Sequence, residues 1–264
     1  AFTPGPVSFL LNMLVPSPLE AATAGRSSLI VRIPDHPVAL SLIRRAGFPI
    51  AAPSANTSGR MSGTELSMIM HDLGERVDAY VDGGPAVIGL ESTILDVRFP
   101  EHITILRPGV VGREEIEKEV DEAYTQGRLS VKPLIQEGYA TTRGETTPGA
   151  KYAHYAPTTP LTALLGEKIV DKPSYACAYV ATDEWIRAQG IEPRMHPVKH
   201  GDAWYVSLGS GQDIPGIARR LYYSLYQADS VQAKQIFLVR EPWGAGTGIG
   251  RAIDDRITKM LGKR

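Results

Sequence analysis

The sequence has little of several features that mark specialised protein classes. Its 264 residues include one cysteine, Cys177, so the chain cannot form an internal disulfide. That usage favours a reducing compartment, and we expect a cytoplasmic protein. No apolar run approaches the roughly 18 residues of a membrane span, so we expect no membrane association. The net charge of −1 gives no overall basic field of the kind that attracts nucleic acid.

Small polar residues and glycine are instead concentrated between residues 51 and 64. Apolar residues then follow at the spacing of one helix face: Leu66, Ile69, Met70 and Leu73. Short polar side chains would therefore precede a helix N-terminus, where N–H groups and the helix dipole favour phosphate. The simpler alternative is that Ser62 or Thr64 only caps the helix.

The first 126 residues alternate between strand-like and helix-like segments. The pattern predicts strands at Ser28–Ile33, Thr93–Arg98 and Ile103–Arg107, and helices at Pro37–Arg45, Thr64–Val77 and Arg113–Tyr124. Short adjacent strands between helices indicate a mixed sheet in an α/β fold.

Residues 127–160 interrupt this pattern with repeated glycine and proline, and we interpret them as an interdomain linker. The second half of the linker gathers cationic and aromatic side chains: Lys151, Tyr152, His154 and Tyr155. Such groups can stack on a base and neutralise phosphate, so we expect this part to act as a lid.

A second α/β pattern occupies residues 161–264. It predicts strands at Cys177–Ala181, Trp204–Leu208 and Ile236–Arg240, a helix at Pro215–Tyr226, a glycine-rich loop at Gly244–Gly250 and a helix ending at Leu261. Strand, glycine-rich loop and helix is a layout found in nucleotide sites, but the spacing does not satisfy G-x-G-x-x-G. A regulatory or nucleotide-sensing surface is the better interpretation.

Two further segments resemble a phosphate-binding loop and a metal site, but other residues in them argue against both. Residues 144–151 imitate a P-loop, but Ala150 is inserted and Tyr152 replaces the hydroxyl residue that would hold magnesium. His196 and His200 lie four residues apart, but Pro197 argues against one helix presenting both. We therefore predict no protein metal site.

Seven segments, in order along the chain, resemble motifs of the threonylcarbamoyl-AMP synthase family, whose catalytic domain is of the YrdC type. Each motif alone is weak, but seven in order are specific. The segments are Pro4–Pro6 (P-G-P turn), Val31–His36 (V-R-x-P-x-H), Pro53–Gly59 (S-x-N), Glu91–Asp96 (S-T-x-x-D), Leu106–Gly109 (R-x-G), Thr147–Pro157 (linker of two-domain members) and Gly248–Arg256 (end of the second domain).

The resemblance implies a YrdC-like mixed twisted sheet with helices, a linker and a smaller Rossmann-like α/β domain. The corresponding boundaries are 1–126, 127–160 and 161–264. In the family an N-terminal portion with a K-x-R motif precedes the P-G-P turn. Because no such motif lies upstream here, we expect this chain to be an N-terminally incomplete piece, whose activity alone is in doubt.

The family reaction joins L-threonine, bicarbonate and ATP, with Mg2+, into threonylcarbamoyl-AMP and pyrophosphate. A separate transferase then makes threonylcarbamoyladenosine in tRNA. The resemblance implies catalytic roles for Ser54 and Asn56 and threonine contacts by Arg32 and Ser92. It implies ATP contacts by Ser28, Ala52, Ser54, Ser62, Arg107 and Tyr155.

Two alternatives stay open. One is a carbamoyl-adenylate-forming domain like that of hydrogenase-maturation carbamoyltransferases, which shares the YrdC-type core. The other is a non-catalytic nucleotide- or RNA-binding module, since YrdC-type cavities are basic, and this leaves binding of double-stranded RNA or tRNA as an expectation.

Overall fold

The computed structural model describes residues 1–14, 19–23, 25–138, 155–166, 175–243 and 248–262. The chain divides into two compact units. The first unit contains residues 1–53, 91–151 and 247–252, and the second contains residues 54–90, 152–246 and 253–264. The division is not the simple N-terminal and C-terminal split that the sequence suggests, because residues 54–90 cluster with the C-terminal part of the chain.

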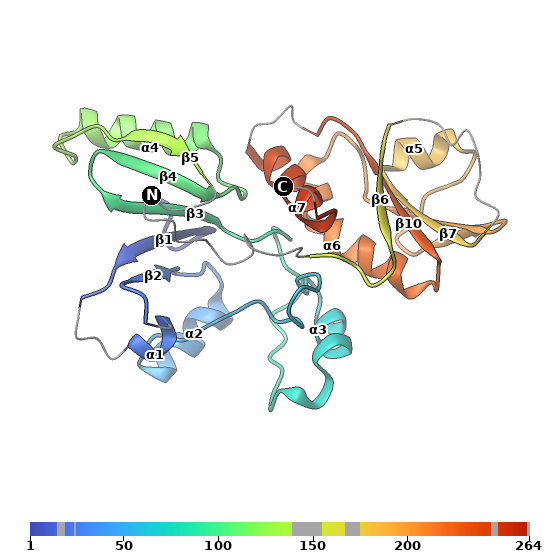
Figure 1. Cartoon of the computed structure of the whole chain (residues 1–264), viewed down its shortest axis with the longest axis horizontal. Helices are drawn as coiled ribbons and strands as arrows, with labels where there is room; N and C mark the ends of the chain where they lie inside the picture. The colour runs from blue at the N-terminus through green and yellow to red at the C-terminus, as the bar shows by residue number, and fades with distance from the viewer. Residues whose placement is uncertain (15–18, 24, 139–154, 167–174, 244–247, 263–264) are drawn as a thin grey trace. The chain divides into compact units, whose positions relative to one another are not determined.

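The sheet of the first unit is mixed, as predicted, with the order β2-β1-β3-β4-β5 (Figure 1). Strand β1 pairs antiparallel with β2 and parallel with β3, while β3 and β4 form an antiparallel pair. The strands are β1 (Val7–Asn12), β2 (Ser28–Val31), β3 (Thr93–Phe99), β4 (His102–Arg107) and β5 (Leu134–Glu137).

Helix α4 (Arg113–Thr125) covers one face of this sheet (Figure 1). Ile116 and Val120 of α4 pack against strand residues that include Val7, Leu95 and Ile105. Among the described residues, a small apolar cluster centred on Leu10, Ile94 and Leu106 lies on the opposite face. Since side chains alternate along a strand, the neighbours of Val7 and Leu95 project to that second face.

The local structure of the first unit agrees with the sequence prediction only in part. The helix α2 (Pro37–Ala46) ends at Gly47, whose left-handed backbone (φ 72°) confirms the predicted stop. Strand β2 ends at Val31, earlier than predicted. Strand β5 lies inside the predicted linker and pairs parallel with β4, so the linker is not free of regular structure. The short helix α1 (Glu20–Thr23) was not predicted.

Residues 54–90 contain α3 (Leu66–Leu73) followed by the 3-10 turn η1 (Gly74–Arg76). The predicted buried face was partly wrong, because Met68 is buried whereas Met70 is exposed. The simpler alternative of a helix cap is not found: Glu65, rather than Ser62 or Thr64, precedes the helix, and it makes no side-chain cap.

The sheet of the second unit has the order β6-β10-β7-β9-β8 and is parallel except for β8. Helix α5 (Asp183–Ala188) lies on one face and α6 (Ile214–Ser230) on the other (Figure 1). Helix α7 (Gly248–Met260) follows the last strand. The strands are β6 (Leu161–Leu165), β7 (Cys177–Ala181), β8 (Val198–His200), β9 (Ala203–Ser207) and β10 (Gln235–Arg240).

The central strand β7 is fully buried, which fits its continuous apolar sequence. Cys177 lies in this strand as predicted, and burial raises the pKa of its thiol. The apolar face of α6 is confirmed by the burial of Ile217, Leu221 and Leu225. The sequence did not predict β6, α5 or β8. Across the described residues, no helix has the length and apolar character needed to traverse a bilayer.

Candidate functional site

Ser8, Ser92 and Arg107 form a polar cluster on the first unit's sheet, on the face opposite α4. The hydroxyl oxygens of Ser8 and Ser92 are 2.7 Å apart, and both side chains are buried. Arg107 donates from Nε to the carbonyl oxygen of Ser92 at 3.0 Å and from Nη2 to its hydroxyl at 3.1 Å. A fixed guanidinium beside two hydroxyls is suited to holding an anionic group.

Gly109 explains why Ser92 sits so close to the end of β4. A Cβ atom at Gly109 would lie 2.3 Å from the backbone nitrogen of Thr93 and 2.8 Å from the carbonyl carbon of Ser92. Only glycine permits that approach. Thr93 is held further, since its hydroxyl donates to the carbonyl oxygen of Val111 at 2.8 Å.

Arg32 is fixed by the P-G-P turn. Its Nε donates to the carbonyl oxygen of Gly5 at 2.9 Å, while the amide of Gly5 donates to the carbonyl oxygen of Ile33 at 2.9 Å. Arg32 itself is exposed, and partial desolvation lowers its pKa. Two of the sequence motifs are therefore bound to each other, with the guanidinium at the surface of the unit.

Ser28 and Ala52 complete the predicted residues of the first unit. Ser28 is buried at the start of β2, opposite Asn12, and belongs to the same face as Ile30 and Leu10. Ala52 is exposed and lies outside any helix or strand.

The S-x-N segment lies in the second unit as a compact loop. Asn56 donates from Nδ2 to the carbonyl oxygens of Thr57 (2.9 Å) and Arg60 (3.3 Å). Its Oδ1 is buried and has no hydrogen-bond partner among the described residues. An acceptor that is desolvated and unpaired is costly, and such a group in a native fold calls for a donor from a ligand or water. Ser54 is exposed, and Ser62 is half-buried.

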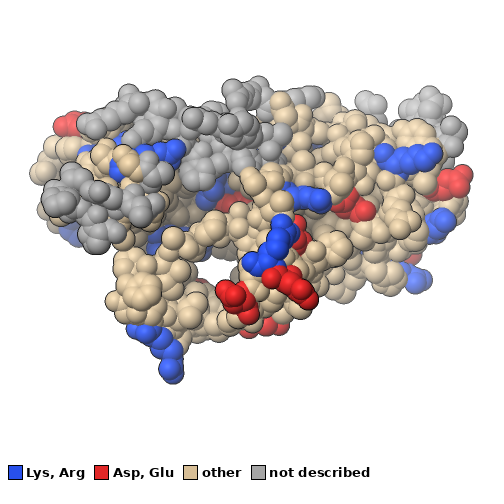
Figure 2. Space-filling model, turned by 60° about the horizontal axis from the view of Figure 1, so that its bottom comes forward, with Lys and Arg blue, Asp and Glu red and all other residues tan. Residues whose placement is uncertain are grey.

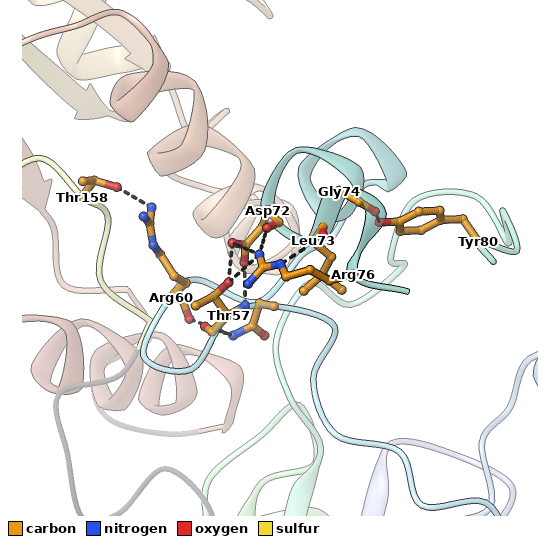
Figure 3. Close-up of polar contacts among 9 residues, drawn as sticks. Thr57, Arg60, Asp72, Leu73, Gly74, Arg76, Tyr80 and Thr158 are labelled. Carbon is orange, nitrogen blue, oxygen red and sulfur yellow. Dashed lines mark hydrogen bonds and ion pairs between the residues drawn. The ribbon is translucent and has the colours of Figure 1, made fainter. Parts of the chain in front are cut away.

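Asp72 of α3 clamps this loop (Figure 3). Its carboxylate accepts from the amide of Thr57 at 2.6 Å and from the Thr57 hydroxyl at 2.7 Å. Arg76 donates from Nη2 to the same hydroxyl at 3.1 Å. Burial acts to raise the pKa of Asp72, but the bonds from Thr57 and the charges of Arg60 and Arg76 outweigh it and lower the pKa.

Tyr155, the predicted lid residue, is buried in the second unit. Its ring lies 5.7 Å from that of Tyr222, and the guanidinium of Arg256 lies 5.7 Å from the centre of the Tyr155 ring. Its φ of 70° is in the left-handed region, which a bulky residue rarely adopts. Arg256 is itself fully buried and paired with Asp255. The other predicted lid residues, Lys151, Tyr152 and His154, lie outside the described residues.

The structure brings some of the predicted site residues into contact. Ser92 and Arg107 touch directly, and Ser28, Arg32 and Ala52 belong to the same unit. Ser54, Asn56, Ser62 and Tyr155 belong to the other unit. Sequence reasoning missed Ser8, Thr57 and Asp72. Ser8 had a visible signal, because it is a single hydroxyl within an apolar strand; the acidic partner of Thr57 lies 15 residues away and had none.

Metal binding by the described residues, and nucleic-acid binding by the face drawn in Figure 2, receive no support. Among them, no group of three or more His, Cys, Asp or Glu side chains could hold a metal ion. On the face drawn in Figure 2, the basic and acidic side chains of the described residues are interspersed and form no continuous patch of one sign. The hydroxyl and arginine groups described above suit phosphate or carboxylate instead.

Comparisons with known proteins cover the whole chain. A family model described as "Telomere recombination" matches residues 1–109, and one described as "Threonylcarbamoyl-AMP synthase, C-terminal domain" matches residues 111–260. Two curated relatives named threonylcarbamoyl-AMP synthase align with all of the chain. The Bacillus subtilis protein is 35% identical, with 71% of its length covered, and the Pyrococcus abyssi protein is 36% identical, with 72% covered.

A yeast relative of the same name, from Schizosaccharomyces pombe, is 32% identical over 86% of the chain, which spans 57% of that protein. Among solved structures, P. abyssi Sua5 complexed with L-threonine aligns with all of the chain at a TM-score of 0.75 and 27% identity, with 72% of that structure covered. A double variant of the same archaeal protein aligns at a TM-score of 0.69.

Proposed function

This chain belongs to the threonylcarbamoyl-AMP synthase family, and from this premise we propose its function. The function is the synthesis of L-threonylcarbamoyl-adenylate and pyrophosphate from L-threonine, bicarbonate and ATP. The observation that carries it is the 35% identity to a synthase over the entire chain, across both matched domains. The product would serve a transferase that modifies an adenosine of tRNA.

The reaction places specific demands on the residues. Threonine and bicarbonate form a carbamate with loss of water, and a carbamate oxygen then attacks the α-phosphorus of ATP as pyrophosphate leaves. Both partners are anionic, so fixed cations and hydrogen-bond donors must hold them together. No protein nucleophile is needed, which agrees with a polar cluster built from hydroxyls and arginine.

We assign the residues within each unit as follows. Arg32 binds the threonine carboxylate, and Ser92 contacts threonine while Arg107 holds Ser92 in place and faces the nucleotide. The assignment of Arg32 rests on its exposed guanidinium, fixed by one bond to Gly5. We assign the remaining ATP contacts to Ser28, Ala52, Ser54, Ser62 and Tyr155.

Asn56 receives the most specific role. The buried, unpaired Oδ1 of Asn56 is ready to accept a hydrogen bond, whereas both phosphate and carboxylate offer only acceptors. We therefore assign Oδ1 to a donor such as the carbamate N–H or a ribose or threonine hydroxyl. This assignment specifies the catalytic role that the family resemblance implies for Asn56.

Magnesium would enter with ATP. Mg2+ is normally held by one or two carboxylates together with substrate phosphates and water. The described residues provide no cluster of such ligands, but their hydroxyls and arginines fit the phosphates of a nucleotide that carries its own Mg2+. When bound, the ion would offset negative charge on the leaving pyrophosphate.

The alternative of a carbamoyl-adenylate-forming domain explains less of the chain. It shares the core of the first family match but gives no account of the second match over residues 111–260. RNA binding as the sole activity has no supporting observation on the face of Figure 2.

Pyrophosphate release tests the proposal in the protein that carries this chain. Release should require ATP, threonine and bicarbonate together, and Ser92→Ala should reduce it. Ser210→Ala is the matched control, because the Ser210 hydroxyl is also hydrogen-bonded to a neighbouring side chain, that of Glu184, but Ser210 lies in the other unit. Equal release with serine, glycine or no amino acid would reject the proposal.

A further inference from the structure

The loop that carries Asn56 is held on two sides within the second unit. On one side the α3 clamp described above grips Thr57 through Asp72. On the other side Arg60 joins the loop to Ala156 and Thr158, and Thr158 lies 98 positions further along the chain (Figure 3). The second family model covers these later residues, whereas the first covers the loop.

Arg60 makes the second connection. Its Nη1 donates to the hydroxyl of Thr158, and its backbone forms a parallel bridge with Ala156. Arg60 is also part of the loop's own turn, because its carbonyl oxygen accepts from Asn56 and its amide donates to the carbonyl oxygen of Thr57 at 3.0 Å. Displacement of Arg60 would therefore disturb the hydrogen bond that orients the Asn56 side chain.

Asp229 fixes the far end of this connection. This α6 residue accepts from the amide of Thr158 at 2.9 Å (Oδ2) and from the amide of Thr159 at 2.8 Å (Oδ1). Two short bonds to one carboxylate are charge-assisted and hold the Thr158 backbone in a single position. Asp229 thus sets where the Thr158 hydroxyl can meet Arg60.

Helix α6 also holds the downstream end of residues 54–90, the segment that contains the Asn56 loop. Arg219 of α6 donates from Nε to the carbonyl oxygen of Val87 at 2.9 Å. Gly89 packs so tightly on α6 that a Cβ there would lie 2.4 Å from the Cα of Arg219. The segment that follows the Asn56 loop is therefore packed directly against α6 as well.

We propose that Asp229 is a positioning residue for the reaction: it acts through Thr158 and Arg60 to hold the loop that carries Asn56. The second domain then contributes to catalysis without touching substrate. The kinetic part of this inference rests on the proposed function, but the structural part does not.

The test compares Asp229→Asn with Glu184→Gln. Glu184 is a matched control, because its carboxylate also accepts two hydrogen bonds from adjacent loop residues, the hydroxyl of Ser210 (2.7 Å) and the amide of Gly211 (2.8 Å), but neither residue bonds to Arg60. Hydrogen exchange of the amides in residues 56–60 is measured without substrate, and kcat and KM for ATP are measured by pyrophosphate release.

Asp229→Asn should speed exchange at the Arg60 amide about tenfold, the equivalent of one lost charge-assisted hydrogen bond. It should lower kcat/KM for ATP by about tenfold to a hundredfold, since small misplacement of a reacting group has effects of that size. Glu184→Gln should leave both quantities within about twofold of the wild type, which is the scatter expected of a surface substitution.

Thr158 provides a second pair of variants if Asp229→Asn folds poorly. Thr158→Val removes the hydroxyl that Arg60 uses and should reproduce the loss, whereas Thr158→Ser keeps it and should restore activity. The inference is overturned if loop exchange and kcat/KM in Asp229→Asn and Thr158→Val match those of Glu184→Gln. If the wild-type protein that carries this chain releases no pyrophosphate, only the proposed function is rejected. The hydrogen-exchange experiment still decides whether Asp229 holds the Asn56 loop.

Discussion

Ser92 presents both its hydroxyl and its carbonyl oxygen to the guanidinium of Arg107, so a change in either residue moves the other. Ser8 holds the same hydroxyl from the neighbouring strand. In the proposed role as a threonine contact, a serine that is already fixed in place would lower the entropic cost of binding. The same holds for Arg32, whose Nε is occupied by Gly5.

Arg32→Ala should weaken threonine binding more than ATP binding. Losing one partner of a hydrogen-bonded charge pair costs about 2–5 kcal/mol of binding free energy. Because Arg32 is exposed, we expect a loss of about 2 kcal/mol, which corresponds to a roughly 30-fold rise in the Kd for threonine. Isothermal titration with each ligand measures it, with Arg26→Ala as an exposed arginine control. Equal losses for both ligands would remove Arg32 from the amino-acid site.

Gly109→Ala should destabilise the first unit by about 1–3 kcal/mol, because the new methyl group overlaps the Ser92–Thr93 backbone. Gly127→Ala is the comparison, since a Cβ there meets nothing within 4 Å. Its only expected cost is the left-handed backbone conformation, about 1 kcal/mol of folding free energy. Chemical denaturation gives both values. A smaller loss for Gly109→Ala than for Gly127→Ala would contradict the close-packing explanation.

At the scale of elements, the sequence predicted most strands and helices that have a strong apolar period or a clear stop. Helix α6 is the clearest case, with Pro215 in its first turn and one buried face. Strands β1, β5, β6 and β8 were missed, and each of the last three is at most five residues long and lies beside glycine or proline. Their stability comes from pairing with a neighbour, which a local pattern does not record.

The site residues were predicted through motif order, which gave no sign of the residues that hold them. Asp72 and Asp229 each bind backbone amides of a loop that is distant in sequence, and a lone aspartate on a polar helix face gives no sign of such a contact. Met70 was misplaced for a related reason: the side of α3 that is buried depends on the loop and segment packed against it. Tertiary contacts decided these features.

The contact between Asp229 and residues 158–159 should give a measurable pH dependence. Burial acts to raise the pKa of Asp229, but the bonds from Thr158 and Thr159 outweigh it and lower the pKa. A carboxyl whose folded-state pKa is lowered stabilises the fold above its unfolded pKa, and this contribution is lost as the pH falls through the folded value.

The stability difference between wild type and Asp229→Asn should therefore be largest near neutral pH and should shrink on acidification. Urea unfolding at a series of pH values measures it. A difference that stays constant down to the acid range would mean that the ionised carboxylate is not what holds the two amides.

At the scale of the molecule, the two family matches meet near residue 110, yet the compact units do not follow that boundary. Residues 54–90 belong to the first match but pack with the helices and strands of the second. The domain boundaries at 126 and 160 remain our prediction, with the first sheet extended to Glu137 by β5. Residues of the second match therefore hold a loop of the first, since Thr158 binds Arg60 and Asp229 binds the amides of Thr158 and Thr159.

Identification of the adenylate product tests the central claim most directly. The protein that carries this chain is incubated with ATP, L-threonine and bicarbonate labelled with heavy carbon, and the products are analysed by mass spectrometry. The account predicts threonylcarbamoyl-adenylate that retains the heavy carbon, and no such product when threonine is omitted. Formation of an adenylate without the label, or of the same product without threonine, would contradict it.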